Sequence, residues 1–123
     1  MYQRVELIGN VTKDAEMRFT PSGVAVTSFT VAINEKYGEK ESVIWVKVTT
    51  WAKQAEVCFE YVKKGMLIFI AGRLIAGEDG NPKVFTRNDG SAGSAYEIKA
   101  QDVKFLSRVG QREEANELEE VPF

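Results

Sequence analysis

The sequence contains no histidine and only one cysteine, Cys58, among its 123 residues. Without an imidazole or a second thiol there is no Ser-His-Asp triad, no zinc cluster of histidine and cysteine, and no intramolecular disulfide. A nuclease with metal-bound carboxylates remains as an enzyme class, but the acidic residues are scattered along expected turns. We therefore expect a protein that is not an enzyme, that needs no cofactor or metal, and that resides in the cytoplasm.

Long apolar runs are also missing. The longest one, Met66–Ala71, is much shorter than the roughly 20 residues that a membrane-spanning helix needs. The first residues, Met1–Glu6, carry charge where a signal peptide has an apolar stretch. We expect neither export nor insertion into a membrane.

The net charge of −2 hides a partition between the body of the chain and its end. Residues 1–108 hold 15 basic and 13 acidic residues, a net charge of +2, whereas residues 109–123 hold one basic and five acidic residues, a net charge of −4. We predict one folded domain over 1–108 and a short linker with an acidic tail over 109–123, each with its own electrostatic role.

The hydrophobic pattern predicts an all-β protein with one helix. Strands are expected at 5–8 continuing through 17–20, then at 24–34, 43–51, 66–75 and 96–106, with a short strand at 83–86 and a flexible loop at 88–94. Ala55, Cys58, Phe59 and Val62 have the spacing of a one-sided helix that ends near Gly65. Three strands, a helix and two strands predict an OB-fold, a five-stranded Greek-key barrel with one short helix between the third and fourth strands. A plain β-sandwich is the alternative.

The strand at 43–51 is the most informative segment, because its side chains alternate between two faces. One face carries Ile44, Val46 and Val48, and the other carries Trp45, Lys47, Thr49 and Trp51. Two indoles beside a cation suit single-stranded nucleic acid, since every base stacks on an aromatic ring and every phosphate attracts a cation.

Two other interpretations of this face remain open. Both tryptophans would belong to the core if the face were buried, but an apolar interior would then also have to bury the Lys47 ammonium. A protein interface is the second alternative, because tryptophan is enriched at such surfaces. Five phenylalanines among aliphatic residues are instead expected in the core: Phe19, Phe29, Phe59, Phe69 and Phe105.

Two further aromatics are weaker candidates for base stacking. Tyr37 lies in an expected charged loop beside Lys36 and Lys40, where it is equally well explained as an incidental exposed ring. Phe85 lies between Lys83 and Arg87, on a hairpin that would close over a bound strand. Lys83 and Arg87, together with Lys36, are further candidates for contacts with DNA phosphates. Further cations border the expected groove and are otherwise explained as solubilising charges: Arg4, Lys53 and Arg73.

In the order and spacing of several stretches, the chain resembles the bacterial single-stranded DNA-binding protein family. These stretches are 5–10, 17–23, 45–51, 55–57 with 60–65, and 70–74. The resemblance implies sequence-independent binding and protection of single-stranded DNA in replication, recombination and repair, at the nucleoid. It also implies a homotetramer, which the sequence itself supports only through Tyr2, Val5 and Leu7 on a strand that would pair with another copy.

Carried over by position, the family's stacking aromatics match Trp45, Trp51 and Tyr37. Its basic DNA contacts fall at or near Lys47, Lys53, Arg4 and Arg73. One position departs from the family, because Glu78 or Asp79 stands where a further aromatic is common, and acids there repel phosphate. Phe85 is the expected substitute.

The end of the chain resembles the acidic terminal peptide with which this family binds replication and repair proteins. The residues expected to bind partners are Glu119, Glu120, Val121, Pro122 and Phe123. A ring and an α-carboxylate at Phe123 suit a pocket with a basic rim, while the glutamates steer the peptide by long-range attraction. A disordered end without function is the alternative. Only 109–116 lies where the family has a long linker, which limits the reach of the tail.

An OB-fold module whose sheet mainly contacts proteins, such as a primosomal accessory protein, is the rival function. The acidic end with Pro122 and Phe123 argues against it.

Overall fold

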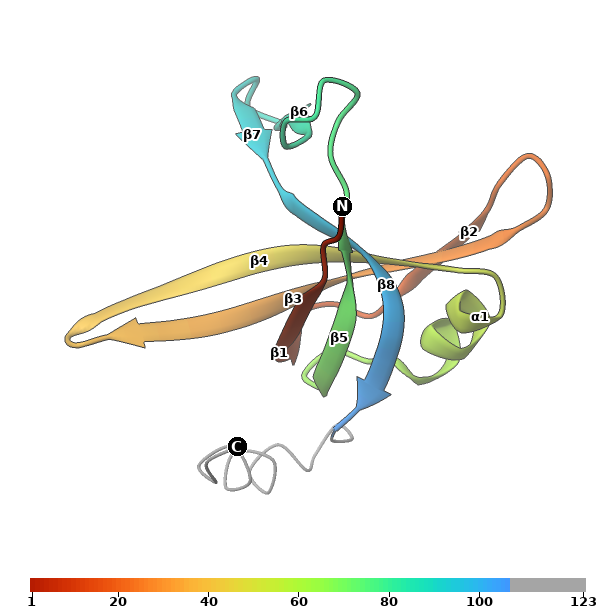
Figure 1. The fold of residues 1–123 in the computed structure, drawn as a ribbon, viewed down its shortest axis with the longest axis horizontal. Coiled ribbons are helices and arrows are strands. Elements are labelled where there is room, and N and C mark those ends of the chain that lie inside the picture. The colour runs from red at the N-terminus through yellow and green to blue at the C-terminus, as the bar shows by residue number, and fades with distance from the viewer. Residues whose placement is uncertain (107–123) are drawn as a thin grey trace.

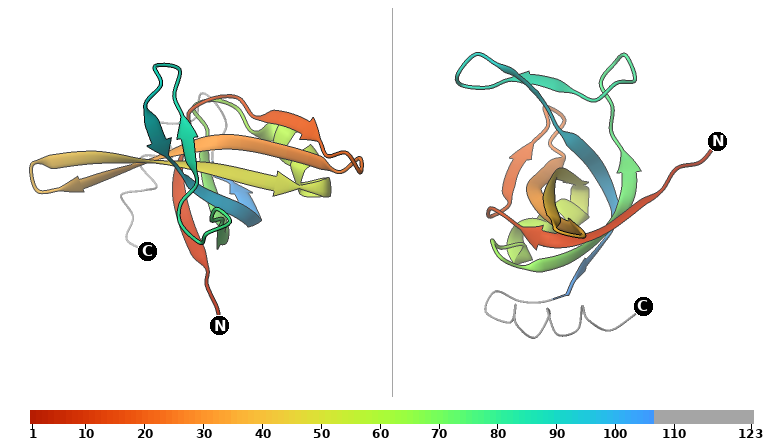
Figure 2. Two further views of the ribbon diagram at one scale, coloured as in Figure 1. Left: turned by 90° about the horizontal axis from the view of Figure 1, so that it is seen from above. Right: turned by 90° about the vertical axis from the view of Figure 1, so that its left-hand side faces the viewer.

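A computed structural model describes residues 1–106, in which five long strands close into a barrel (Figure 1, Figure 2). These strands are β1 (Val5–Val11), β3 (Ala25–Tyr37), β4 (Lys40–Trp51), β5 (Leu67–Leu74) and β8 (Tyr96–Phe105). Their order is β1-β5-β8-β4-β3, and β3 pairs back onto β1 to complete the ring. All pairs are antiparallel except β4 with β8. The predicted OB-fold is confirmed, and the β-sandwich alternative is wrong.

One helix is found in the described part of the chain, α1 (Ala52–Tyr61), and it lies between β4 and β5, as predicted. It buries Ala55 and Cys58 against the barrel, and the Thr27 hydroxyl donates a 2.6 Å hydrogen bond to the Ala55 carbonyl. The helix begins directly after Trp51 and ends at Tyr61, before the end that was expected near Gly65. Within residues 1–106, no helix has the length and apolar character needed to cross a membrane.

The barrel core consists mainly of β-branched side chains from alternate positions of the long strands, as the period-2 pattern predicts. The largest fully buried ones include Val31, Val48, Ile68, Ile70 and Ile98. Phe29 belongs to this core, but the same prediction is wrong for Phe19, Phe59 and Phe105, which are exposed, and Phe69 is only partly buried.

The positions of two of the exposed phenylalanines in the fold explain their exposure. Phe19 is 63% exposed because it ends β2 (Glu16–Phe19), an edge strand whose one neighbour is β3. Phe105 lies at the end of β8 and packs its ring 6.0 Å from that of Tyr61. An apolar residue on a strand is thus buried only where a second element covers it.

Two glycines allow the close approaches that the barrel requires. A Cβ atom at Gly9 would lie 2.5 Å from the Ala32 carbonyl oxygen, where β1 meets β3. At Gly72 a Cβ atom would overlap the Lys99 carbonyl, next to the irregularity in the pairing of β5 with β8. At both positions two backbones come too close for any residue other than glycine.

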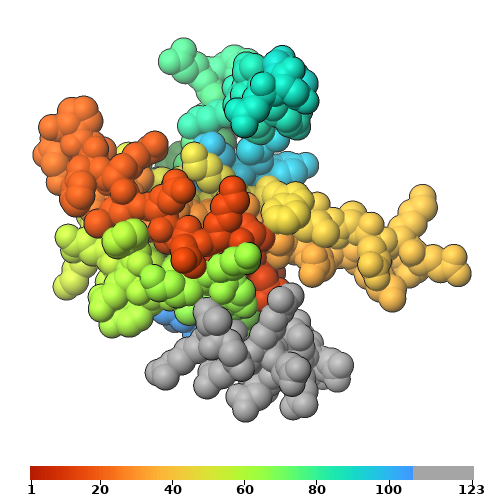
Figure 3. Space-filling model, turned by 180° about the vertical axis from the view of Figure 1, so that it is seen from behind, coloured from red at the N-terminus to blue at the C-terminus, as the bar shows by residue number. Residues whose placement is uncertain are grey.

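Two hairpins project from the barrel. The outer part of β3 and β4 forms one, and β6 (Val84–Thr86) with β7 (Ala92–Ser94) forms the other. Figure 3 shows them as separate projections, the first in yellow and orange and the second in teal. The prediction of a loop over 88–94 is wrong at its end, because 92–94 pairs with β6.

Candidate nucleic-acid interface

The outward face of β4 carries the two tryptophans. Trp45 is 55% exposed and Trp51 is 40% exposed, while Lys47 between them is partly buried. Val46 and Val48, on the other face, are buried in the core. The side chains alternate as predicted, except that Thr49 is also buried.

Small side chains of β3 lie beside this face of β4. In the register of the two strands, Ala32 is opposite Trp45, Thr30 is opposite Lys47, and Ser28 is opposite Thr49. Directly opposite residues of a sheet project from the same face. These small side chains of β3 form a shallow surface, called the floor below, with an indole at each end. The floor leaves space beside each indole for the flat ring of a base.

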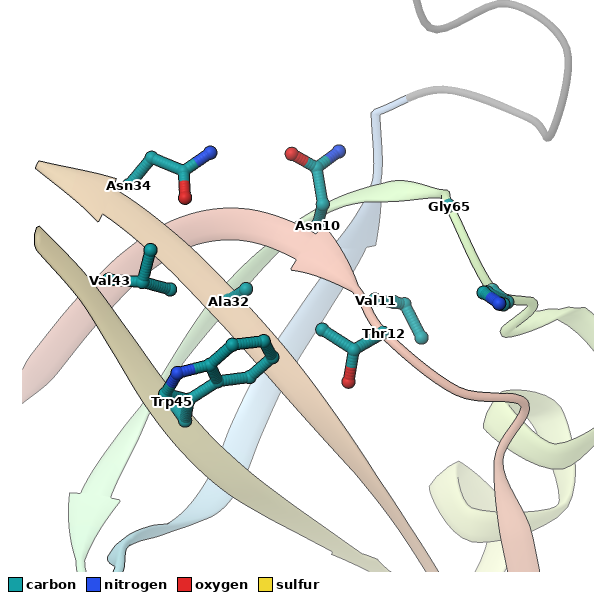
Figure 4. Close-up of a pocket in the computed structure, with 9 residues that line it drawn as sticks. Asn10, Val11, Thr12, Ala32, Asn34, Val43, Trp45 and Gly65 are labelled. Carbon is teal, nitrogen blue, oxygen red and sulfur yellow. The ribbon is translucent and has the colours of Figure 1, made fainter. Parts of the chain in front are cut away.

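A pocket of about 330 Å³ lies at the Trp45 end of this floor. Figure 4 shows Asn10 and Asn34 on one side of Ala32 and the Trp45 indole on the other. Lys64 also lines the pocket, on a loop held to β1 by a 2.7 Å hydrogen bond from the Gly65 amide to the Val11 carbonyl. The Asn10 Nδ2 atom is buried and has no hydrogen-bond partner among the described residues. The pocket thus combines the Trp45 indole with amide side chains of β1 and β3.

A cation that was not among the sequence-based candidates covers Trp51. The Lys99 Nζ atom lies 5.5 Å from the centre of the Trp51 ring, within the range of a cation–π interaction. Lys99 lies on β8, opposite Thr49 of β4. The only local signal was its place on the last strand, because the register of β8 against β4 depends on pairing between distant segments.

Several of the predicted cations form ion pairs. Arg4 donates to Glu6 Oε1 at 3.0 Å and to Asp102 Oδ2 at 3.1 Å, and these hydrogen bonds raise the pKa of its guanidinium. The Lys83 Nζ atom lies 3.3 Å from Glu97 Oε2 on β8. Their charges are therefore partly compensated within the protein, as is that of Lys36, which lies 4.0 Å from Glu41.

Two predicted cations are exposed near Trp51. Lys53 lies on the first turn of α1, and Arg73 lies near the end of β5, opposite Lys99. Neither forms an ion pair within residues 1–106. They remain available for an anion.

Tyr37 lies at the end of β3, far from the barrel, and its side chain is 69% exposed. Its hydroxyl donates a 3.0 Å hydrogen bond to Glu35 Oε2, which raises the pKa of the phenol. Tyr37 pairs with Lys40, whereas Trp45 pairs with Ala32, which lies five residues before Tyr37 in β3. Strand alternation places Tyr37 and Trp45 on opposite faces of the hairpin, so the structure does not gather all predicted aromatics on one surface.

Phe85 lies on the β6–β7 hairpin and is partly exposed. The Arg87 guanidinium carbon lies 5.6 Å from its ring centre, and Arg87 also donates to the Ala92 carbonyl. A Cβ atom at Gly93, directly opposite, would lie 2.9 Å from the ring. The absence of a side chain at Gly93 lets the ring and the guanidinium pack over β7 and order the hairpin.

The acids at Glu78 and Asp79 are exposed in the connection between β5 and β6. Hydrogen bonds from the Asn81 amide and side chain hold the pKa of Asp79 below its usual value. This carboxylate therefore stays charged near neutral pH. It repels the phosphates of a DNA backbone from the connection between β5 and β6.

The sequence profile of the single-strand binding protein family matches residues 2–106, which is the whole barrel with both hairpins. The chain belongs to the single-strand binding protein family. The match includes the two-tryptophan face of β4 and every cation discussed above.

Proteins named single-stranded DNA-binding proteins resemble this member of the single-strand binding protein family. The one from Halalkalibacterium halodurans is 36% identical over 116 residues, which cover 91% of this chain and 65% of that protein. The one from Clostridium tetani is 39% identical over 106 residues, covering 84% and 69%. Single-stranded DNA-binding protein A of Bacillus subtilis is 36% identical over 110 residues, covering 86% and 60%. The chain thus spans about two thirds of the length of these relatives.

The predicted tail residues, 119–123, lie outside the described residues and outside the family match.

Proposed function

We propose that residues 1–108 bind single-stranded DNA without sequence preference and protect it. The observation that carries this proposal is the pair of exposed indoles, Trp45 and Trp51, on one face of β4 with Lys47 between them. The names of the relatives, all single-stranded DNA-binding proteins, support the same substrate. Because every base presents a π-face, stacking on indoles selects unpaired bases rather than a sequence.

The remaining candidates have graded roles in this proposal. Lys47, Lys53 and Arg73 attract the phosphates, since a charged backbone contributes much of the affinity for any nucleic acid. The β6–β7 hairpin, with Phe85 and Arg87, contacts the strand as a flap beside the barrel. Tyr37 contacts it only if the strand continues around the tip of the β3–β4 hairpin. The cations already in ion pairs contribute less: Arg4, Lys36 and Lys83.

We further propose that the protein serves replication, recombination and repair in the cytoplasm, at the nucleoid, through a tail that recruits partner proteins. The support is the charge partition of the sequence, which gathers five of the acids in residues 109–123, together with the terminal Pro122 and Phe123. An acidic peptide repels DNA and is attracted to a basic pocket, so the barrel and the tail would bind different partners.

A homotetramer is proposed on the basis of β1. This strand pairs with β5 along most of its length, but with β3 only at Asn10 and Val11. The edge of Val5–Gly9 that faces away from β5 has no strand partner among the described residues. Such an edge is a template for pairing with a second copy. Light scattering after size-exclusion chromatography tests this, and a mass of one subunit of 13.8 kDa at micromolar concentration would contradict it.

The alternative function, a module whose sheet mainly binds proteins, predicts a different response to nucleic acid. Gel-shift titrations separate the two functions. They use a dT oligonucleotide or a duplex of the same length, with no partner protein present. We expect a complex with the single strand alone. Equal shifts with both nucleic acids would contradict selective binding of the single strand, and no shift at low salt would favour the alternative.

A further inference from the structure

Two cations stand side by side on adjacent strands close to Trp51. Arg73 of β5 is directly opposite Lys99 of β8, and Lys99 is in turn opposite Thr49 of β4. Figure 1 shows β5 and β8 running next to each other in the barrel wall. Adjacent strands are about 4.8 Å apart, so these side chains leave the sheet as neighbours. Like charges directly opposite one another destabilise a sheet unless something compensates them.

Nothing within residues 1–106 compensates this pair by an ion pair. The acids nearest to it along β8 are engaged elsewhere: Glu97 with Lys83, and Asp102 with Arg4. Both side chains of the pair are exposed. The arrangement leaves two uncompensated positive charges on a rigid sheet, which is where an anion binds with least rearrangement.

The Lys99 ammonium also lies 5.5 Å from the centre of the Trp51 ring. This contact joins the cation pair to one of the two proposed stacking surfaces. A nucleotide whose base stacks on Trp51 carries its phosphate within reach of a lysine side chain anchored at this point. Thr49, which is directly opposite Lys99 and two residues before Trp51, is small and buried. Its side chain therefore does not obstruct a DNA strand that passes from Trp51 to Lys99.

We propose that Arg73 and Lys99 form a phosphate-binding site for the nucleotide stacked on Trp51, and that the DNA strand crosses there from β4 onto β8 and β5. The inference rests on the proposed function and adds the direction in which the strand leaves the β3–β4 face. A base that stacks on the lysine-covered side of Trp51 displaces the ammonium, which then contacts the phosphate. The strand thus turns toward β5 after Trp51.

The test is the salt dependence of binding to a dT oligonucleotide, measured by fluorescence with the full chain. Each phosphate contact to a single strand contributes about 0.7 to the slope of log affinity against log salt. Lys99→Ala and Arg73→Ala should each reduce the slope by about that amount. The ratio of wild-type affinity to variant affinity should then be about fivefold smaller at about 300 mM salt than at about 30 mM salt.

Two control variants make the outcome specific. Lys104→Ala removes an exposed lysine from the same strand, opposite Phe69 and away from Trp51, and should leave the slope unchanged. Lys99→Arg keeps the charge and should retain the wild-type slope. Thermal unfolding of each variant confirms that the fold is intact.

The outcomes separate the site from the function it rests on. A wild-type slope in Lys99→Ala, or an equal change in Lys104→Ala, would overturn the site while DNA binding persists. So would a loss of affinity in Lys99→Ala that is the same at every salt concentration, because that means the lysine only positions the indole. Failure of the wild type to bind at low salt would overturn the proposed function, and the site with it.

Discussion

Trp45 and Trp51 project from the same face of β4 and are six residues apart, which separates them by about 20 Å along the strand. The floor between them is made of small side chains of β3, such as Ser28 and Thr30. A single base does not span this distance. The two indoles are therefore separate platforms for different nucleotides of one strand that follows β4.

We predict that Trp45→Ala and Trp51→Ala each weaken binding to a dT oligonucleotide by about 1–3 kcal/mol, roughly 5- to 150-fold, because each removes one stacking surface. Both rings are partly exposed, so the variants should still fold. Tyr61→Ala is the matched control, since it removes an exposed ring from α1. Equilibrium titrations by fluorescence anisotropy of a labelled oligonucleotide measure the effect. Equal losses in all three variants would mean that the face of β4 is not special.

The face of β4 could be predicted because strand alternation is a local property. Trp45 and Trp51 share parity with each other and not with the buried Val46 and Val48, whatever the rest of the chain does. The order of strands and the position of α1 likewise follow from local periodicity and turn signals. These local patterns were sufficient for the barrel.

The errors concern contacts between distant segments. The contact of Lys99 with Trp51 depends on the register of β8 against β4, which no local pattern encodes. The exposure of Phe19 depends on β2 being an edge strand. The strand at 92–94 depends on Gly93 accommodating the Phe85 ring from the other side of the hairpin.

The residue after Trp51 provides a test of backbone strain. Ala52 has a φ angle of +56°, in the left-handed region that favours glycine, and its side chain is exposed. We predict that Ala52→Gly stabilises the fold by about 0.5–1 kcal/mol, because relief of strain exceeds the entropy that glycine adds to the unfolded chain. Thermal unfolding followed by circular dichroism should show a rise of a few degrees.

Ala76→Gly is the control for this change. Ala76 is also exposed but has no positive φ angle, so glycine there should lower the midpoint slightly. If both substitutions lower the midpoint alike, Ala52 is not strained.

The buried thiol predicts a loss of stability in alkali. Burial raises the pKa of Cys58 from 9.0 to about 11, and a hydrogen bond with Thr50 acts in the opposite direction. Above pH 9 the unfolded chain therefore releases this proton before the folded one does. The stabilising contribution is complete below pH 9 and is lost as the pH rises to about 11, with a slope of at most about 1.4 kcal/mol per pH unit.

Urea unfolding at several pH values between 8 and 11 measures this slope. Cys58→Ala should be less stable at neutral pH because it loses packing, but its stability should fall less steeply in alkali. Comparing the two proteins cancels the titration of tyrosines and lysines that both contain. If the free energy of unfolding fell with pH in parallel for the two proteins, the pKa of the Cys58 thiol would be the same in the folded and the unfolded chain.

The tail should be separable from DNA binding. We predict that deleting Val121–Phe123 leaves affinity for single-stranded DNA unchanged or slightly higher, because the three deleted residues have no basic side chain that could bind phosphate. The same deletion should abolish capture of purified replication and repair proteins on immobilised chain. A tail with the last five residues in scrambled order controls for charge. Loss of DNA affinity on deletion would mean instead that the tail supports the barrel.

The most direct measurement of the central claim is a titration of the intrinsic tryptophan fluorescence with dT oligonucleotide at several salt concentrations. Trp45 and Trp51 are the only tryptophans, so the signal comes from the face in question. The stacking arrangement predicts strong quenching at low salt, with an affinity that falls steeply as salt is added. Absence of quenching at low salt, or binding that leaves the fluorescence unchanged, would contradict it.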